Sequence, residues 1–211
     1  MSTFAKRERL LLADLLETAG PDAPTLCEGW QTRDLAAHVV VRERRPDAAG
    51  GMLIKQLAPR LEKAMEEFTA KPYEELIQLI RIGPPRFSPF QLKQIDEMSN
   101  TVEFYVHTED VRRAQPDWTA RELDPVFQDA LWSRLERTAR LMGRKAPTGL
   151  VLRRPDGQTA VAHRGAPVVT VTGEPSELLL FVYGRQSAAK VDVVGDQDAI
   201  TKLQESKQLG I

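Results

Sequence analysis

The sequence is poor in cysteine and in long apolar runs, and each shortage excludes a class of protein. Cys27 is the single cysteine among 211 residues, so no disulfide can form within the chain. No apolar run approaches the roughly 18 residues that a membrane-spanning helix requires. Asp14 and Glu17 interrupt the leucine-rich N-terminal segment, which therefore predicts an amphipathic helix rather than a signal peptide. We expect a cytoplasmic protein with no membrane partner.

The sequence also lacks an excess of charge of either sign. Lysine and arginine total 29, aspartate and glutamate total 30, and the formal net charge is -1. A nucleic-acid-binding protein would carry a basic footprint, so we expect no nucleic-acid partner. The glycine-rich phosphate-binding loop, the G-x-G-x-x-G dinucleotide motif and the G-x-S-x-G elbow of serine hydrolases are absent from the sequence. The sequence therefore gives no indication of a nucleotide-binding protein or a serine hydrolase of these classes.

The spacing of apolar residues predicts two domains of different kinds. Helical periodicity, broken by proline and glycine, predicts an all-helical domain over residues 1–146. Its helices are expected at 3–19, 32–45, 52–69, 73–82, 92–114 and 124–143. Beyond them, short β-rich runs alternate with helical ones, and an Asp-Gly pair between two runs predicts a hairpin. The fold class expected is multidomain, α followed by a small α+β domain over residues 147–211.

The segment "EFYVHTED" at positions 103–110 places many titratable groups on a helix that is expected to be in the core. Glu103 and His107 are four residues apart, so their side chains meet at the edge of the apolar face. His38 lies on the apolar face of the helix over 32–45. Taken separately, a core histidine and a surface ion pair are the commoner interpretations. Taken together, inward Glu and His on facing helices predict a metal site with open coordination positions.

Three runs of sequence carry a resemblance to a known family. The run "TRDLAAHV", close after a tryptophan, and "NTVEFYVHTEDVRRA" resemble the N-terminal domain of the mycothiol-dependent maleylpyruvate isomerase family. That domain belongs to the DinB-like superfamily of metal-binding four-helix bundles. The later "VTGEPSELLLFVYGR" resembles the small sterol-carrier-like domain often attached to it. The resemblance covers nearly the whole chain and implies an uncharacterised branch of this family. It assigns the bundle to 1–146 and the sterol-carrier-like domain to 147–211.

The resemblance also implies a site and a chemistry. It places the family's divalent metal ion, commonly zinc, on His38, Glu103 and His107. It implies a metal-dependent enzyme that uses a low-molecular-weight thiol, such as mycothiol, for isomerisation or S-transfer on a small electrophile. A bound metal would lower the pKa of that thiol. The alternative is a non-catalytic metal-binding or regulatory stress module, in which a fourth protein ligand closes the coordination sphere.

The roles of several residues stay open at this point. Arg42, one turn after His38, and Arg185 are candidates for binding a carboxylate substrate, and the alternative for each is a salt bridge, for instance to Asp110 or Glu109. Asp110 is also a candidate fourth ligand, while Glu109 has no assigned role. A set of two histidines and one carboxylate suits zinc, nickel, iron and manganese alike.

Two further residues have competing interpretations. Cys27 is a reactive thiol, a further metal ligand or a small buried hydrophobe, and the last is the commonest role of a single cysteine. His163 ends a strand of the expected hairpin, and we expect it at the surface. The oligomeric state is left open.

Overall fold

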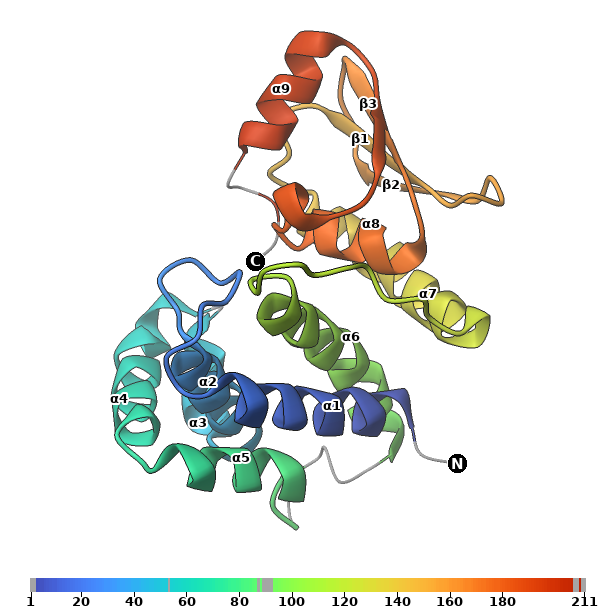
Figure 1. Cartoon of the computed structure of the whole chain (residues 1–211). Coiled ribbons are helices and arrows are strands. Elements are labelled where there is room, and N and C mark those ends of the chain that lie inside the picture. The colour runs from blue at the N-terminus through green and yellow to red at the C-terminus, as the bar shows by residue number, and fades with distance from the viewer. Residues whose placement is uncertain (1–2, 53, 87, 89–92, 207–208, 210–211) are drawn as a thin grey trace. The chain divides into compact units, whose positions relative to one another are not determined.

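The structure divides into two compact units, residues 1–119 and 120–211. The computed structural model describes residues 3–52, 54–86, 88, 93–206 and 209. The sequence predicted the order of the two parts, helices first and a mixed α and β region second (Figure 1). Among the described residues, no helix combines the length and the apolar character needed to cross a bilayer.

The first unit consists of helices. They are α1 (Phe4–Ala19), α2 (Thr32–Arg44), α3 (Pro46–Ala49), α4 (Ala58–Thr69), α5 (Tyr73–Ile82) and α6 (Lys93–Arg112). The main departure from expectation precedes α4, where Gly50–Met52 and Lys55–Leu57 form short 3-10 turns instead of one continuous helix. Glycine is a poor helix former, and Pro59 is tolerated only in a first turn, so the regular helix begins at Ala58.

The apolar faces of these helices enclose one core. Helix α1 packs along α6 and α5, and α2 packs against α4 and α5 (Figure 1). On α1 the fully buried Ala5, Leu12 and Leu16 recur at the spacing of one helical face. The Tyr73 hydroxyl, carried by α5, donates a hydrogen bond of 2.8 Å to the carbonyl of Leu16. This packing brings α2 and α6 into the same core.

The second unit contains a four-stranded sheet and helices. Its elements are α7 (Pro125–Met142), β1 (Gly149–Arg153), β2 (Thr159–His163), β3 (Val168–Thr172), α8 (Pro175–Val182), β4 (Asp192–Val194) and α9 (Gln197–Glu205). The strand order is β2-β1-β3-β4, with β1 and β3 parallel and the other pairs antiparallel. The predicted hairpin is β1–β2, and Gly157 takes the positive φ of 92° that its turn requires.

The division between the units differs from the boundary expected at residue 146. Helix α7 packs against α8 and β2, within the second unit, rather than joining the helices that precede it. Its C-terminal end approaches β2 closely, because a Cβ atom on Gly143 would lie 2.8 Å from the Cβ of Ala162. The apolar pattern of α7 predicts a buried face, but it does not specify which partner covers that face.

Candidate metal centre

Helix α2 holds His38 in the core of the first unit. The backbone N–H of Gln31 donates to the Asp34 carboxylate at 2.9 Å, which ties down the first turn of the helix. His38 is one helical turn further on, and its side chain is 8% exposed. The ring centroids of Trp30 and His107 lie 5.2 Å and 5.1 Å from that of His38. The two neighbouring rings restrict the orientation of the imidazole.

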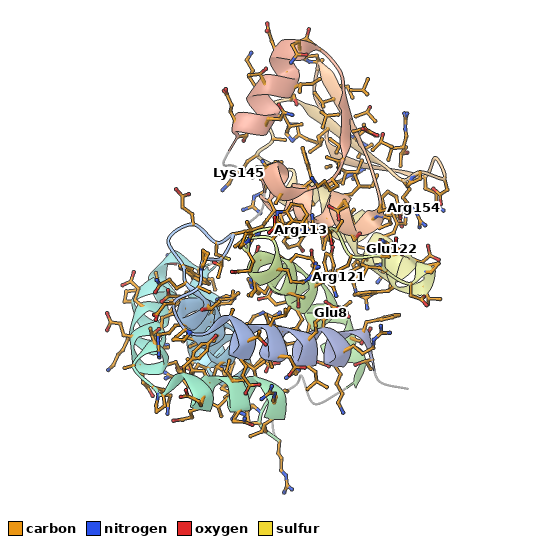
Figure 2. All side chains as sticks on the ribbon, in the orientation of Figure 1. Glu8, Arg113, Arg121, Glu122, Lys145 and Arg154 are labelled. Carbon is orange, nitrogen blue, oxygen red and sulfur yellow. The ribbon has the colours of Figure 1, made fainter. Side chains whose placement is uncertain are left out.

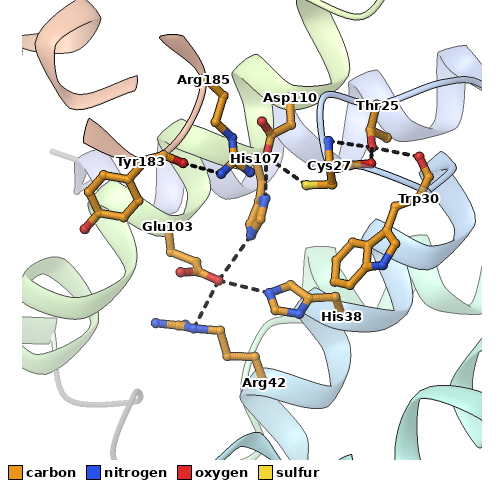
Figure 3. Close-up of polar contacts among 10 residues, drawn as sticks. All are labelled: Thr25, Cys27, Trp30, His38, Arg42, Glu103, His107, Asp110, Tyr183 and Arg185. Carbon is orange, nitrogen blue, oxygen red and sulfur yellow. Dashed lines mark hydrogen bonds and ion pairs between the residues drawn. The ribbon is translucent and has the colours of Figure 1, made fainter. Parts of the chain in front are cut away.

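Helix α6 brings the other two predicted ligands to the same place. Glu103 Oε1 lies 3.2 Å from His38 Nε2 and 3.3 Å from His107 Nε2 (Figure 3). The candidate ligand atoms of the three residues all lie within 4.8 Å of one another. The structure therefore brings together all three residues that the sequence singled out, although His38 and Glu103 are 65 positions apart.

The spacing of these atoms fits a small divalent ion. In a tetrahedral site with bonds of about 2.0–2.1 Å, two ligand atoms are about 3.4 Å apart. The distances of 3.2 Å and 3.3 Å from Glu103 Oε1 to the two imidazole nitrogens differ from that separation by only one or two tenths of an ångström. Two imidazoles and one carboxylate also form a donor set that catalytic zinc sites use.

Asp110 lies behind one of the candidate ligands. Its Oδ2 atom is 2.9 Å from His107 Nδ1, and its side chain is fully buried. When Nδ1–H donates to this carboxylate, the lone pair of Nε2 faces Glu103 and His38. Metal-ligating histidines are commonly oriented by such a second hydrogen bond. The i, i+3 spacing from His107 was the available sequence signal for this contact.

Cys27 joins the same network from the loop before α2. Its Sγ atom donates to Asp110 Oδ2 at 3.2 Å, and the backbone N–H of Leu26 donates to the Asp110 carbonyl at 3.0 Å. Cys27, His107 and Asp110 form a second group of donor atoms within 4.8 Å of one another. The cysteine is partly exposed and hydrogen-bonded, so it is more than a packed hydrophobe.

Arg42 makes an ion pair that the sequence analysis did not anticipate. Its Nε atom lies 3.2 Å from Glu103 Oε1, and its guanidinium also donates to the Asn100 side chain. The salt-bridge alternative had named Asp110 or Glu109 as partners for an arginine in this role. The structure instead places Arg42 against a candidate metal ligand, where its charge stabilises the ionised form of Glu103.

Glu109 and Arg185 have contacts within their own units. Glu109 is fully buried, and its carboxylate accepts from Arg112 at 3.0 Å and from Arg113 Nε at 2.6 Å. This ion-pair cluster accounts for Glu109, to which the sequence assigned no role. Arg185 donates to the carbonyl of Tyr183 within the second unit, and its role in substrate binding stays a prediction.

The surroundings set different charges on the three candidate ligands. Burial lowers the pKa of His38 despite its hydrogen bond to Glu103, which favours the neutral imidazole. Burial raises the pKa of Glu103, but hydrogen bonds from His107 and His38 and the charge of Arg42 hold it well below its usual range. Burial also opposes the charged form of His107, yet its hydrogen bonds to Asp110, Cys27 and Glu103 raise its pKa well above the ordinary value.

These charges describe a site ready to exchange a proton for a cation. Glu103 is an anion and His38 offers a neutral lone pair, as metal ligation requires. A cation would displace the proton on His107 Nε2, while Nδ1–H stays hydrogen-bonded to Asp110. Metal binding would then release protons and weaken at low pH.

Comparison with known proteins identifies a shared fold. No family model matches this sequence, and no curated protein matches it. Two solved structures do, a crystal structure of the mycothiol-dependent maleylpyruvate isomerase and one of a histidine-to-alanine mutant of it. The TM-scores are 0.54 and 0.58, at 18% and 17% identity, and both matches cover 92% of this chain and 95% of the solved chain. The chain therefore shares its fold with a mycothiol-dependent maleylpyruvate isomerase.

Proposed function

We propose that this chain binds a divalent metal ion through His38, Glu103 and His107 and acts as a metal-dependent enzyme on a small electrophile. The observation that carries the proposal is the convergence of two Nε2 atoms on one carboxylate oxygen, at 3.2 Å and 3.3 Å. Zinc is the ion proposed, because catalytic zinc sites use this donor set. When bound, the ion supplies a Lewis acid that lowers the pKa of a thiol.

The protein residues around the ion have separate tasks in this proposal. His38, Glu103 and His107 hold the ion, and Asp110 orients His107 through Nδ1. Arg42 keeps Glu103 ionised and brings positive charge to the same face of α2. The anionic thiol and an acidic substrate would both be favoured next to that charge.

The arrangement favours an enzyme over a closed structural site. Three protein ligands leave room for a water or a substrate atom, whereas structural zinc sites are usually closed by four. Asp110 contacts His107 at Nδ1, on the opposite side of the ring from the Nε2 atom that faces Glu103. Asp110, the candidate fourth ligand, therefore orients the imidazole of His107 instead of completing the coordination sphere.

The proposed co-reactant is a low-molecular-weight thiol of the mycothiol type. The support comes from the names of the two solved structures that share the fold, both mycothiol-dependent isomerases. The proposed reaction is isomerisation or S-transfer on a small electrophile. We also propose that the first unit is a DinB-like bundle and that the sheet of the second unit is sterol-carrier-like.

A non-catalytic metal-binding or regulatory module is the second candidate function. It is favoured by the partly exposed thiol of Cys27, which contacts the carboxylate behind His107. Modification of that thiol would disturb the orientation of a metal ligand without any turnover. Such a protein would respond to thiol-reactive stress through its metal affinity.

Elemental analysis tests the metal site directly. The parent protein, the His107→Ala variant and the His163→Ala variant are purified and incubated with zinc. We expect one equivalent of metal in the parent and in His163→Ala, which alters a histidine of the other unit, and little in His107→Ala. Circular dichroism checks that the variants keep their helical content. Full metal occupancy in His107→Ala would show that the ligand assignment is wrong.

Turnover separates the two candidate functions. The fully metallated protein is assayed with mycothiol and a panel of small electrophiles that includes maleylpyruvate. The enzyme proposal expects a rate that needs both the metal and the thiol and that falls in Glu103→Gln. A metallated protein that turns over no member of the panel supports the module instead.

A further inference from the structure

A basic groove lies in the second unit, between the end of α7 and strand β2. It encloses about 370 Å³ and is lined by Arg140, Arg144, Val161, Ala162, His163 and Arg164. This volume is at the lower end of the range of small-molecule sites. The lining contains no acidic residue. His163, expected at the surface, is partly exposed and lines this groove.

The close approach of α7 to β2 brings the arginines together. Arg140 is in the last turn of α7, and Arg144 is four residues later. Gly143, between them, permits the helix end to lie against Ala162 at a distance that a larger residue would prevent. Arg164 follows directly after β2, so it reaches the groove from the strand side.

These three arginines differ from other arginines of the same unit. Arg154, labelled in Figure 2, pairs with Asp129 at 2.8 Å, and its guanidinium lies over the ring of Trp132. The side chains of Arg140, Arg144 and Arg164, in contrast, make no hydrogen bond or ion pair within the part of the chain that the structure describes. All three are exposed, and their donors remain available to a ligand.

A favourable interaction with the helix dipole explains only part of this cluster. A basic residue in the last turn of α7 interacts well with the helix C-terminus, which accounts for Arg140. Arg164 is on the other wall and gains nothing from that dipole. Positive charges that share one groove repel each other, and an anion between them would turn that repulsion into attraction.

We propose that this groove binds a small dianion, a phosphate monoester whose apolar part lies on the exposed side chain of Val161. Guanidinium groups bind paired anionic oxygens through parallel N–H···O hydrogen bonds, which suits a phosphate group. Arginines on both walls of the groove can contact the same phosphate, while the exposed methyl groups of Val161 contact the apolar substituent. The site lies within one unit and needs no metal.

Titration with phenyl phosphate at constant ionic strength tests the proposal. Binding to the full chain is followed by calorimetry and by the NMR signals of the Val161 methyl groups. We expect saturable binding that weakens about tenfold or more in Arg144→Gln and again in Arg164→Gln, as the loss of one charge-assisted hydrogen bond predicts. Arg137→Gln is the matched control, because Arg137 is an exposed arginine of α7 that does not line the groove.

Three outcomes would overturn the proposal. An equal loss of phenyl phosphate affinity in Arg137→Gln would mean that the ligand responds to the general positive charge of this surface rather than to a defined site. Absence of saturation with phenyl phosphate would mean that no small dianion binds there. Binding to vesicles of phosphatidylcholine with phosphatidic acid is measured beside binding to phenyl phosphate. Vesicle binding that depends on the arginines, without phenyl phosphate binding, would assign the groove to a lipid surface. The His107→Ala variant should bind phenyl phosphate like the parent, so this result is separate from that of the metal site.

Discussion

Glu103 and Glu109 lie on the same helix and have different sets of partners. Glu109 is fully buried and its oxygens accept from Arg112 and Arg113. Glu103 Oε1 is shared by two imidazoles and Arg42. Arginine keeps its proton under all ordinary conditions, whereas an imidazole can lose one and offer a lone pair.

This difference separates a structural ion pair from a site that can accept a metal. The arginines that pair with Glu109 cannot become metal ligands, because a guanidinium group offers hydrogen-bond donors only. The imidazoles around Glu103 can lose a proton and offer a lone pair, which is what the proposed metal site requires. The number of buried charges is therefore a poor guide to function, and the chemistry of the partners decides.

The largest effect is expected from Glu109→Gln. This change removes the negative charge that pairs with Arg113, whose side chain is fully buried with that of Glu109. Loss of one partner of a buried ion pair costs about 3–5 kcal/mol of the free energy of unfolding. Urea unfolding measures the loss, and metal content should stay near one equivalent. Glu103→Gln should have the opposite effects: the protein should bind little metal, and the loss in the free energy of unfolding should be smaller than in Glu109→Gln.

Glu43 shows how a third carboxylate, buried and paired with an arginine, makes the stability of the protein depend on pH. It is buried, and both of its oxygens contact the guanidinium of Arg9, which also pairs with Asp96. Burial, only partly offset by Arg9, raises the pKa of Glu43 from 4.5 to about 7. The folded state then binds more protons than the unfolded state between these values, so stability falls as pH rises through that window, by about 3 kcal/mol. Unfolding at several pH values should show this decline in the parent and a flatter profile in Glu43→Gln.

Asp110→Asn tests the support behind His107. The amide cannot hold Nδ1–H as a carboxylate does, so the ring should lose its preferred orientation. Outer hydrogen bonds of this kind typically change metal affinity by about 10–100-fold. Competition with a chromophoric chelator measures the change. An affinity equal to that of the parent would show that Asp110 has only a packing role.

The smallest effect is expected at Cys27. Serine keeps a donor toward Asp110 Oδ2, so Cys27→Ser should change metal affinity by less than about twofold, whereas Cys27→Ala should lower it by about two- to fivefold. The visible spectrum of the cobalt-substituted protein reports the geometry of the site in each variant. A loss in the serine variant as large as in alanine would mean that sulfur itself is needed.

The sequence predicted the helices and the Glu103–His107 pair because both depend on helical periodicity, whereas the approach of His38 to that pair was expected from facing helices of a bundle and from the family resemblance. Glu103 and His107 had to meet across one turn, and His38 had to face the core. The hairpin of β1 and β2 followed equally from the Asp-Gly turn. The predictions of the helices, the Glu103–His107 pair and the hairpin rest on local spacing.

The remaining features depend on contacts between distant segments. Periodicity places Arg42 on a face of α2, but only packing against α6 selects Glu103 as its partner. The contact of Cys27 with Asp110 spans 83 positions, and no spacing rule indicates it. The partner of α7 depends on distant contacts in the same way, since this helix packs against α8 and β2 and its end closely approaches Ala162.

The separation of the candidate ligands along the chain has a consequence for folding. His38 and Glu103 are 65 residues apart, so an ion that they share would link two distant parts of the folded chain. Because the ion would leave when the chain unfolds, it would stabilise the folded state by mass action, by about 2.7 kcal/mol at a hundred times its dissociation constant. Unlike a disulfide, this cross-link can be removed by a chelator and restored by adding the ion. The melting temperature would therefore rise with the free metal concentration.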